Sequence, residues 1–565
     1  MNETLTRYNQ WKDALADDPS ATAELAGLID KPEEMHDRFG TDMAFGTGGI
    51  RGRMELGSNR LNAVVVSRLA QGLANHINEN NCNPLVTIGY DTRRNSTLFA
   101  KSMAEVLAAN GISVLIFKDA APTPLLSYVT RSSDASFGFM ITASHNPSCD
   151  NGVKLYNASG VQLPPDDADK ITVQVSKCDC FTDVKRVKFD DAENIEYISD
   201  ELGEEFIVLS VIDDKSVSDE ELSELRLVYT PLDGAGREYV PKALMKLGIN
   251  PIIVKTQTSK DGEFATCPKP NPEERATWNE AVRYANENDG QLLIATDPDC
   301  DRVGVAERLS DGTFRFFTGN EVGMILLHTL LSQRKAAGTL PENPVVVKTV
   351  VTTPMTYAIA KAFSAEVVDV LTGFKYIGGI LDGLEQSGQL ERYVFGFEES
   401  MGYLVNTNTR DKDAVSASVF IARLAAKLYS ENSSLSAMMD GLYDTYGHYM
   451  SHLMSYEYSS DAGSKKADTL ISDLSSPDGF TLKNDKVRYH LDYRDGIKTN
   501  VKNGTEAKIG LPFTDMISYK FDSGTEISFR PSGTEPKIKV YIATSQEKLE
   551  ECITAVSGFM GRYFR

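Results

Sequence analysis

The sequence lacks any apolar run of the ~18 or more residues that a membrane-spanning helix needs. Its first residues, MNETLTRYNQWKDALADD, are polar and acidic, without the basic and then apolar stretches of a secretory signal. Basic residues are also in deficit, with 58 Lys and Arg against 80 Asp and Glu. Nucleic-acid-binding proteins normally carry a basic surface, which this composition does not favour. We therefore expect a cytoplasmic protein that binds neither membranes nor nucleic acid.

Cysteine is scarce and scattered, because seven residues, an odd number, are spread over 565 positions. Such a distribution implies no disulfide framework. The run Cys178-Asp179-Cys180 contains a close pair, but zinc-binding pairs usually have two or more residues between the cysteines. We interpret these two thiols as incidental.

The overall composition is that of an ordinary globular protein, with 41% hydrophobic and 24% charged residues. At ~100–200 residues per domain, the length predicts three to five domains. Residues 1–40 are expected to form an amphipathic helical lead-in without visible chemistry.

Strand–helix–strand units recur three times beyond this lead-in. The first covers residues 84–117 and continues through a helix near 124–131 to a strand at 136–141. The other two cover 225–254 and 344–370. Strands that alternate with helices predict mostly parallel sheets covered on both faces. We therefore expect three related α/β domains.

The end of the chain has a different pattern. A Ser/Asp/Gly-rich stretch, Ser459–Gly479, precedes alternating strands at 486–493, 526–530 and 537–543, and a final helix from Gln546. This order predicts a smaller α+β domain.

A small hydroxyl residue follows the strand that ends at Ile141, in the run Thr142-Ala-Ser144-His145-Asn-Pro147. The carboxyl ends of strands in open α/β sheets are where ligands bind, so Ser144 is a candidate catalytic residue. The same residue types also favour an ordinary turn, and the residues alone leave both interpretations open. The GxSxG elbow of α/β-hydrolases is absent.

Three carboxylates alternate in the run Asp297-Pro-Asp299-Cys-Asp301-Arg302, after a predicted strand. Unpaired carboxylates repel one another, and a hard divalent cation with oxygen ligands relieves that repulsion. An EF-hand is excluded because its central glycine position is Arg302 and its closing glutamate position is Arg308. A solvated acidic loop is the alternative, and Mg²⁺ is the favoured ion because phosphoryl chemistry uses it.

Two further runs carry polar groups on Gly-containing loops. Gly396-Phe-Glu-Glu-Ser-Met-Gly402 offers adjacent acids that suit hydrogen bonding to hydroxyls, although acids on loops are usually just solvated. Arg530-Pro-Ser-Gly-Thr-Glu-Pro-Lys537 combines cations, hydroxyls and a glycine, which together predict a phosphate-binding nest. An ordinary hairpin turn is the alternative, and a Walker A loop is excluded because no GK[ST] follows.

Together and in this order, the four runs resemble the α-D-phosphohexomutase family, which includes phosphoglucomutases, phosphomannomutases and phosphoglucosamine mutases. The resemblance extends from about Phe45 to Lys539, and the TGFKYIGG and DKDAVSAS runs favour the phosphoglucomutase/phosphopentomutase-like branch. It implies an α/β protein of four domains in a heart-shaped arrangement, with three related mixed-sheet domains and a TATA-binding-protein-like fourth. We expect these domains at 1–207, 208–322, 323–440 and 441–565.

The resemblance also implies roles for individual residues. Ser144 would carry the phosphoryl group, and one Mg²⁺ would be held by a phosphoserine oxygen of Ser144 and by three carboxylates, those of Asp297, Asp299 and Asp301. The implied residues that flank the transfer as charge stabilisers or acid/base candidates are Arg51, His145 and Lys154. The implied residues that bind the sugar or its other phosphate are Gly373, Lys375, Glu398, Ser400, Arg530, Ser532, Gly533, Thr534 and Lys537.

The implied reaction is the reversible interconversion of α-D-glucose 1-phosphate and glucose 6-phosphate through a phosphoserine enzyme, with glucose 1,6-bisphosphate as intermediate and activator. Pentose or mannose phosphates, or synthesis of the bisphosphate itself, are alternatives on the same site. Two departures stand out. Pro298 and Cys300 replace glycines of many members while the Asp spacing is intact, and the sugar loop differs from the GEMSG of phosphomannomutase-type members.

Overall fold

The computed structural model describes residues 2–43, 49–211, 217–458, 461–531 and 537–564. The chain forms two compact units, which are described separately. The first comprises Met1–Gly319, Phe374–Gly396 and Ser400–Leu435, and the second comprises Asn320–Gly373, Phe397–Glu399 and Ser436–Arg565. In the described part of the chain, no helix combines the length and the apolarity that crossing a membrane requires.

Three helices precede the first sheet: α1 (Asn2–Ala14), α2 (Pro19–Ala26) and α3 (Pro32–Phe39). Helix α2 begins where it does because the Asp18 side chain accepts two backbone N–H groups and Pro19 occupies the first turn. The helices pack through the rings of Trp11 and Phe39, whose centroids are 5.7 Å apart. The predicted helical lead-in is confirmed.

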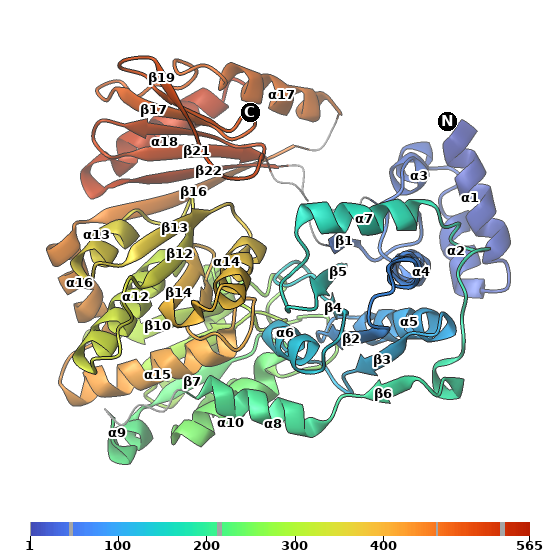
Figure 1. Cartoon of the computed structure of the whole chain (residues 1–565), viewed down its shortest axis with the longest axis horizontal. Helices are drawn as coiled ribbons and strands as arrows, with labels where there is room; N and C mark the ends of the chain where they lie inside the picture. Colours follow the sequence, from blue (N-terminus) through green and yellow to red (C-terminus); the bar gives the residue numbers. More distant parts are fainter. Residues whose placement is uncertain (1, 44–48, 212–216, 459–460, 532–536, 565) are drawn as a thin grey trace. The chain divides into compact units, whose positions relative to one another are not determined.

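The first sheet has six strands in the order β1-β5-β4-β2-β3-β6 (Figure 1). Its central strands β2 and β4 are almost wholly buried, as expected of strands covered on both faces. Strand β5 runs antiparallel to β4 and to β1, so the sheet is mixed, whereas a mostly parallel sheet was predicted. The difference arises because the Ser144 loop joins β4 to β5 as a hairpin. The strands are β1 (Gly49–Arg53), β2 (Leu85–Tyr90), β3 (Ser113–Ile116), β4 (Phe137–Ile141), β5 (Asp150–Asn157) and β6 (Ile195–Tyr197), and the helices are α4 (Ala63–Asn80), α5 (Ser96–Ala109), α6 (Thr123–Ser132) and α7 (Pro165–Ser176).

The second sheet has the order β11-β10-β9-β7-β8, and the third has the order β13-β12-β14-β15. In the second, the strand pairs β7–β8 and β7–β9 are parallel, while β9–β10 is an antiparallel hairpin. Its elements are α8 (Asp200–Ser210), α9 (Asp219–Glu224), β7 (Leu227–Thr230), α10 (Gly236–Leu247), β8 (Ile252–Ile253), α11 (Asn279–Glu287), β9 (Leu292–Thr296), β10 (Val303–Arg308) and β11 (Phe314–Phe316). The elements of the third are α12 (Gly319–Ala336), β12 (Val345–Thr349), α13 (Met355–Ala362), β13 (Glu366–Val370), α14 (Phe374–Gln386), β14 (Tyr393–Glu398), β15 (Gly402–Leu404) and α16 (Leu435–Tyr446). Helix α15 (Ala414–Ser430) packs mainly on α9 and α10 of the second sheet and also contacts β15.

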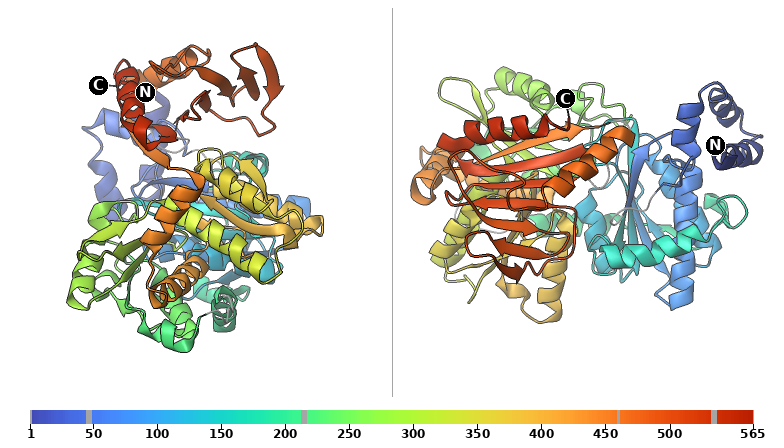
Figure 2. Two further views of the ribbon diagram at one scale, coloured as in Figure 1. Left: turned by 90° about the vertical axis from the view of Figure 1, so that its left-hand side faces the viewer. Right: turned by 90° about the horizontal axis from the view of Figure 1, so that it is seen from above.

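The C-terminal sheet has seven strands in the order β16-β22-β21-β20-β17-β18-β19, which Figure 2 shows side by side in orange to red. Alternate residues of β20, β21 and β22 pack with two helices in one core, so both helices cover the same face. The elements are β16 (Tyr449–Glu457), α17 (Asp461–Asp473), β17 (Val487–Asp492), β18 (Ile497–Asn500), β19 (Thr505–Lys508), β20 (Ile517–Phe521), β21 (Glu526–Pro531), β22 (Lys537–Ser545) and α18 (Leu549–Met560).

Two local features were not predicted from the sequence. Helix α17 lies within the Ser/Asp/Gly-rich stretch Ser459–Gly479, where Leu470 and Ile471 of the helix and Leu474 just after it pack on the sheet. Strand β14 continues through Gly396, which was expected to begin a loop. A Cβ at Gly396 would lie 2.7 Å from the Ile377 side chain, so close packing is what requires a glycine there.

Asp233 illustrates how the second sheet packs on the first within one unit. Its backbone carbonyl accepts the Thr92 hydroxyl at 2.6 Å, and its carboxylate accepts the Ser259 N–H at 2.8 Å. Burial raises the pKa of Asp233 to about 6 from an ordinary 3.8. A raised folded-state pKa means that this group contributes stability below pH ~4 and loses it as the pH rises through 6.

We therefore expect Asp233→Asn, which keeps the oxygen that accepts the Ser259 N–H, to stabilise the protein at pH 8 by roughly 1–3 kcal/mol. At pH 4 the gain should nearly vanish. Thermal unfolding of both proteins at the two pH values measures this difference. A gain of equal size at both pH values, or a loss at pH 8, would contradict the assignment.

Candidate active site

Ser144 lies directly after β4, in the loop that turns into β5. Its side chain is buried and its backbone has φ +52°, a left-handed conformation that residues other than glycine rarely adopt. The Ser144 N–H donates to the Thr142 hydroxyl at 2.8 Å. The loop is therefore an ordered turn, and it presents the serine hydroxyl at the carboxyl end of the strand.

The three acidic residues form a tight turn between β9 and β10. The Asp297 carboxylate accepts the backbone N–H groups of Asp301 and Arg302 at 3.2 and 3.0 Å. Cys300, which occupies a glycine position of many family members, has φ +54°. Its sulfur has room because the neighbouring Gly236 has no side chain, and a Cβ there would lie 2.9 Å from Sγ.

The structure brings the serine loop and the acidic loop together within one compact unit. Ser144 Oγ donates to Asp297 Oδ2 at 2.7 Å. Lys154, from β5, places Nζ 2.7 Å from Asp299 Oδ2 and 2.9 Å from Asp301 Oδ2. The three acids are at most 1% exposed. These groups are about 150 residues apart in the sequence and meet at the ends of two sheets.

The acidic cluster has the properties of a cation site. The three carboxylates offer ligand oxygens that all lie within 4.8 Å of one another. Asp299 Oδ1 and Asp301 Oδ1 are buried, and neither accepts a hydrogen bond from any residue that the structure describes. Leaving buried carboxylate oxygens without hydrogen bonds is costly, and a hard cation would satisfy them. The residues present therefore fit a metal ion.

The charges in this cluster shift its pKa values in opposite directions. Burial and the carboxylates of Asp299 and Asp301 raise the pKa of Asp297 well above its ordinary value. Burial would also raise the pKa of Asp301, but Lys154 and Lys412 outweigh it and lower that pKa. For Lys154, burial lowers the pKa and the two carboxylates outweigh that effect, so the pKa is raised and the lysine is a cation at neutral pH.

Arg51 and His145 both contact the serine loop. Strand β1 pairs with β5 so that Arg51 is opposite Gly152, and Arg51 donates to the Asn146 side chain at 3.2 Å. His145 Nδ1 is 3.3 Å from Ser144 Oγ. Both residues therefore contact the loop that carries Ser144.

Several polar residues of the site were missed from the sequence. Lys412 Nζ lies 3.2 Å from Asp301 Oδ2 and 3.2 Å from Asp411 Oδ1. Asp91 and Arg93, which follow β2, form a fully buried ion pair at 3.3 Å beside the serine loop. The signal that could have found the pair is the polar run DTRRNS directly after a buried strand, the same position that pointed to Ser144.

The expected sugar-binding residues lie at or after the ends of two strands of the third sheet, β13 and β14. Gly373 has φ +116°, and Lys375 is a buried residue in the first turn of α14. Glu398 is the last residue of β14, and its neighbour Glu399 accepts the hydroxyls of Thr349 and Thr352. After Ser400, the Met401 carbonyl accepts the N–H of Val303, the residue after Arg302.

The expected phosphate-binding run lies between paired strands β21 and β22. Arg530 is opposite Lys539 in the register, and the apolar neighbours Phe529 and Ile538 point into the core. Arg530 and Lys537 therefore lie on the sheet face opposite the two helices. Ser532, Gly533 and Thr534 are outside the described residues.

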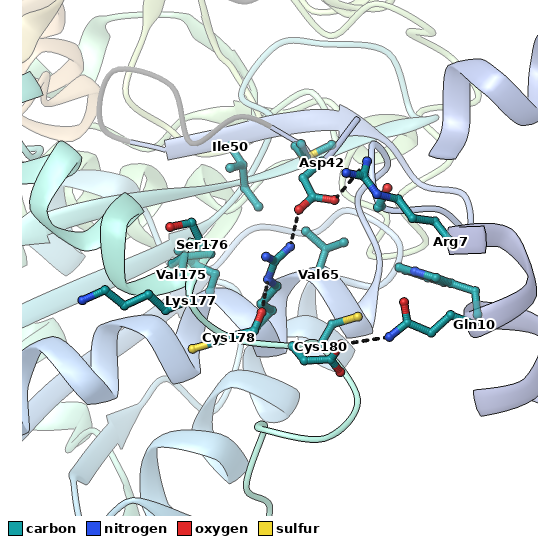
Figure 3. Close-up of a pocket in the computed structure, with 16 residues that line it drawn as sticks. Arg7, Gln10, Asp42, Ile50, Val65, Val175, Ser176, Lys177, Cys178 and Cys180 are labelled. Atoms are coloured by element: carbon teal, nitrogen blue, oxygen red, sulfur yellow. Dashed lines mark hydrogen bonds and ion pairs between the residues drawn. The ribbon is translucent and has the colours of Figure 1, made fainter. Parts of the chain in front are cut away.

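A cavity of about 340 Å³ lies on the other side of β1 (Figure 3). Ile50 lines it, whereas the next residue, Arg51, contacts the serine loop, as expected for successive residues of a strand. Cys178 and Cys180 also line the cavity, and Arg68 donates to the Cys178 carbonyl at 2.8 Å. Burial raises the pKa of Cys180 to about 11, and among the described residues neither thiol belongs to a metal-type cluster.

A buried hydroxyl, a lysine and a carboxylate cluster that fits a cation, brought together where the Ser144 and Asp297 loops meet, suit an enzyme for phosphoryl transfer. Three sequence models of one family match the chain: phosphoglucomutase/phosphomannomutase alpha/beta/alpha domain I over residues 42–179, domain II over 208–310 and domain III over 318–446. The chain belongs to the phosphoglucomutase/phosphomannomutase family.

Individual relatives agree with this assignment. A phosphoglucomutase of Staphylococcus saprophyticus is 34% identical over 525 residues, which cover 92% of this chain and 93% of the relative. The crystal structure of pp63/parafusin, a phosphoglucomutase from Paramecium in its open form, has a TM-score of 0.65 at 17% identity and covers 92% of this chain and 95% of its own. N-acetylphosphoglucosamine mutase of Aspergillus fumigatus, in complex with GlcNAc-6P and magnesium, has a TM-score of 0.51 at 14% identity and covers 98% and 99%.

These matches confirm three predictions made from the sequence. The family inferred from the four runs is correct, and the chain is a phosphoryl-transferring enzyme of the isomerase class. The fold class is also confirmed, with three related mixed α/β sheet domains followed by a C-terminal sheet domain.

Proposed function

We propose that the chain is a cytoplasmic phosphoglucomutase that interconverts α-D-glucose 1-phosphate and glucose 6-phosphate, with Ser144 as the phosphoryl carrier. The observation that carries this proposal is the 2.7 Å hydrogen bond from Ser144 Oγ to Asp297, beside the Lys154 ammonium. The phosphoglucomutase relative that covers 92% of the chain supports glucose as the sugar. We also propose domains at 1–207, 208–322, 323–440 and 441–565.

The reaction consists of two phosphoryl transfers. In the first, the P–O bond to Ser144 breaks and a P–O bond forms to the free hydroxyl of a sugar monophosphate, which gives up its proton while Ser144 gains one. Glucose 1,6-bisphosphate then reorients, and its other phosphoryl group returns to Ser144. Lys154 and His145 are the candidates for moving the proton, and Arg51 and Lys154 stabilise the charge on the transferring group.

Asp297, Asp299 and Asp301 would hold Mg²⁺, together with an oxygen of phosphorylated Ser144. When bound, the ion neutralises the charge of the phosphoryl group during transfer. Magnesium in the crystallised mutase of Aspergillus fumigatus supports this choice of ion. The substrate's other end would be bound by Gly373, Lys375, Glu398 and Ser400 for the sugar, and by Arg530, Ser532, Gly533, Thr534 and Lys537 for the second phosphate.

Incubation with glucose 1,6-bisphosphate tests the proposal directly. We expect intact-mass analysis to show a gain of one phosphoryl group, because the empty serine accepts it from the bisphosphate. Initial rates on glucose, mannose, ribose and glucosamine 1-phosphates should then be highest with glucose 1-phosphate. No gain in mass would refute the phosphoserine, and a higher rate on ribose or mannose phosphate would replace glucose as the substrate.

A further inference from the structure

Arg93 makes an unusual set of contacts with the loop that carries the serine. Its guanidinium is completely buried. One terminal nitrogen, Nη1, donates to the backbone carbonyls of Pro147 at 2.7 Å and Asp150 at 3.1 Å, and the other, Nη2, donates to those of Ser144 and Asn146. The four carbonyl oxygens that it contacts belong to Ser144, Asn146, Pro147 and Asp150. The planar Arg93 guanidinium therefore binds four backbone carbonyl groups of the serine loop at once.

Asp91 connects the same guanidinium, through Thr142, to the backbone N–H of Ser144. Its carboxylate lies 3.3 Å from Arg93 Nε and accepts the Thr142 hydroxyl at 2.6 Å. That hydroxyl in turn accepts the Ser144 N–H at 2.8 Å. The N–H of Ser144 is thus bound through Thr142 and Asp91, and its C=O is bound by Arg93, so one ion pair is connected to both backbone groups of the serine.

A loop that follows β8 of the second sheet and contains Gly262 and Phe264 covers the Asp91–Arg93 ion pair and excludes water from it. The Phe264 ring lies over the Arg93 guanidinium, 4.9 Å from centroid to carbon. Gly262 packs so closely that an added Cβ would be 2.3 Å from the Arg94 nitrogen. Hydrogen bonds from a charged donor are stronger in such a water-free environment than at the surface.

We propose that Arg93, with Asp91, is a positioning residue that holds Ser144 in its left-handed conformation and directs Oγ at Asp297. A strained backbone at a functional residue persists only where its surroundings impose it, and these contacts supply that constraint. The inference rests on the proposed role of Ser144 as phosphoryl carrier. It goes further because Arg93 contacts the backbone of the serine loop and would act on Ser144 through that backbone.

The test compares Arg93→Lys with Arg94→Lys in the full-length protein with Mg²⁺. Arg94 is the matched control, because it is adjacent, half-exposed and paired with Glu263 on the surface. Lysine at 93 keeps the charge beside Asp91 but cannot reach four carbonyls at once. We expect kcat for glucose 1-phosphate to fall about 100-fold, the usual effect of a displacement near 1 Å, with KM unchanged. Arg94→Lys should keep the wild-type kcat.

A second readout separates positioning from general stability. The rate of phosphoryl uptake from glucose 1,6-bisphosphate should fall with kcat in Arg93→Lys, while the folded protein gives the wild-type circular dichroism. In Arg93→Ala, millimolar guanidinium should restore part of kcat, and an equal concentration of NaCl should not. Should Arg93→Lys not fold, Thr142→Val, which removes only the Asp91 link to the Ser144 N–H, replaces it with the same expected fall in kcat.

The outcomes distinguish this inference from the proposed function. Wild-type protein that gains no phosphoryl mass refutes the proposed function, whatever Arg93 does. Wild-type protein that gains the mass, together with a folded Arg93→Lys of unchanged kcat, overturns the positioning role alone. A rise in KM without a fall in kcat also overturns it, because the residue would then serve substrate binding.

Discussion

Ser144→Ala is expected to gain no mass from glucose 1,6-bisphosphate and to lose at least ~10⁴-fold in kcat, as enzymes do when a covalent carrier is removed. The reason is that Ser144 Oγ is the hydroxyl that lies 2.7 Å from the acidic cluster. Ser148→Ala is the matched control, since this serine is in the same loop and half-buried. Intact-mass analysis and initial rates measure the two effects.

A Ser144→Ala protein that still gains one phosphoryl group would place the carrier elsewhere in the chain. Loss of uptake in Ser148→Ala, with unchanged circular dichroism, would show that the loop and not the hydroxyl is what matters. Loss in Ser144→Ala alone is the expected pattern. Peptide mapping of the phosphorylated wild-type protein should then locate the group on the segment that contains Ser144.

The second large effect is expected from Asp299→Ala. Removing this carboxylate takes one ligand from the cluster and one ion-pair partner from Lys154, whose Nζ lies 2.7 Å away. Metal-assisted charge stabilisation supplies several kcal/mol, so kcat at millimolar Mg²⁺ should fall by about 10³-fold. Rates measured against Mg²⁺ concentration, and calorimetric titration with Mg²⁺, report this loss.

Asp311→Ala is the control, because it removes an exposed acid from the turn between β10 and β11 of the same sheet. This variant should bind Mg²⁺ and have the kcat of the wild-type protein. Chelation with EDTA should lower the wild-type rate to the level of Asp299→Ala, and added Mg²⁺ should restore it. Ordinary turnover by Asp299→Ala at millimolar Mg²⁺ would refute the cation site.

The sequence was most informative where a strand is buried on both faces. Strands β2, β4 and β9 are continuous apolar runs, so their ends were placed within one residue and the polar runs after β4 and β9 stood out as candidate site loops. Ligand-type side chains at strand ends are local features, and a local pattern suffices to find them. The order of the four runs then identified the family.

Contacts between distant segments were beyond the reach of local patterns. Lys154 was expected from family resemblance, but its contact with Asp299, 145 residues away, follows from the way two sheets meet. Arg93 was missed because an arginine in a polar run is usually exposed to solvent. Its burial depends on Phe264, a residue distant in sequence that packs over its guanidinium. Gly396 was assigned to a loop because glycine is common in flexible loops. Glycine is also required where side chains pack closely on a strand, which is the case here.

The interleaving of the two compact units along the chain has a consequence for biosynthesis. The first unit contains both Ser144 and Lys412, and it is complete only at Leu435. By then the ribosome has already made Asn320–Gly373 and Phe397–Glu399 of the second unit, whose remaining part starts at Ser436. The site can therefore assemble only late in translation, and no single cut in the gene separates two units that could each be inherited, expressed or exchanged on its own.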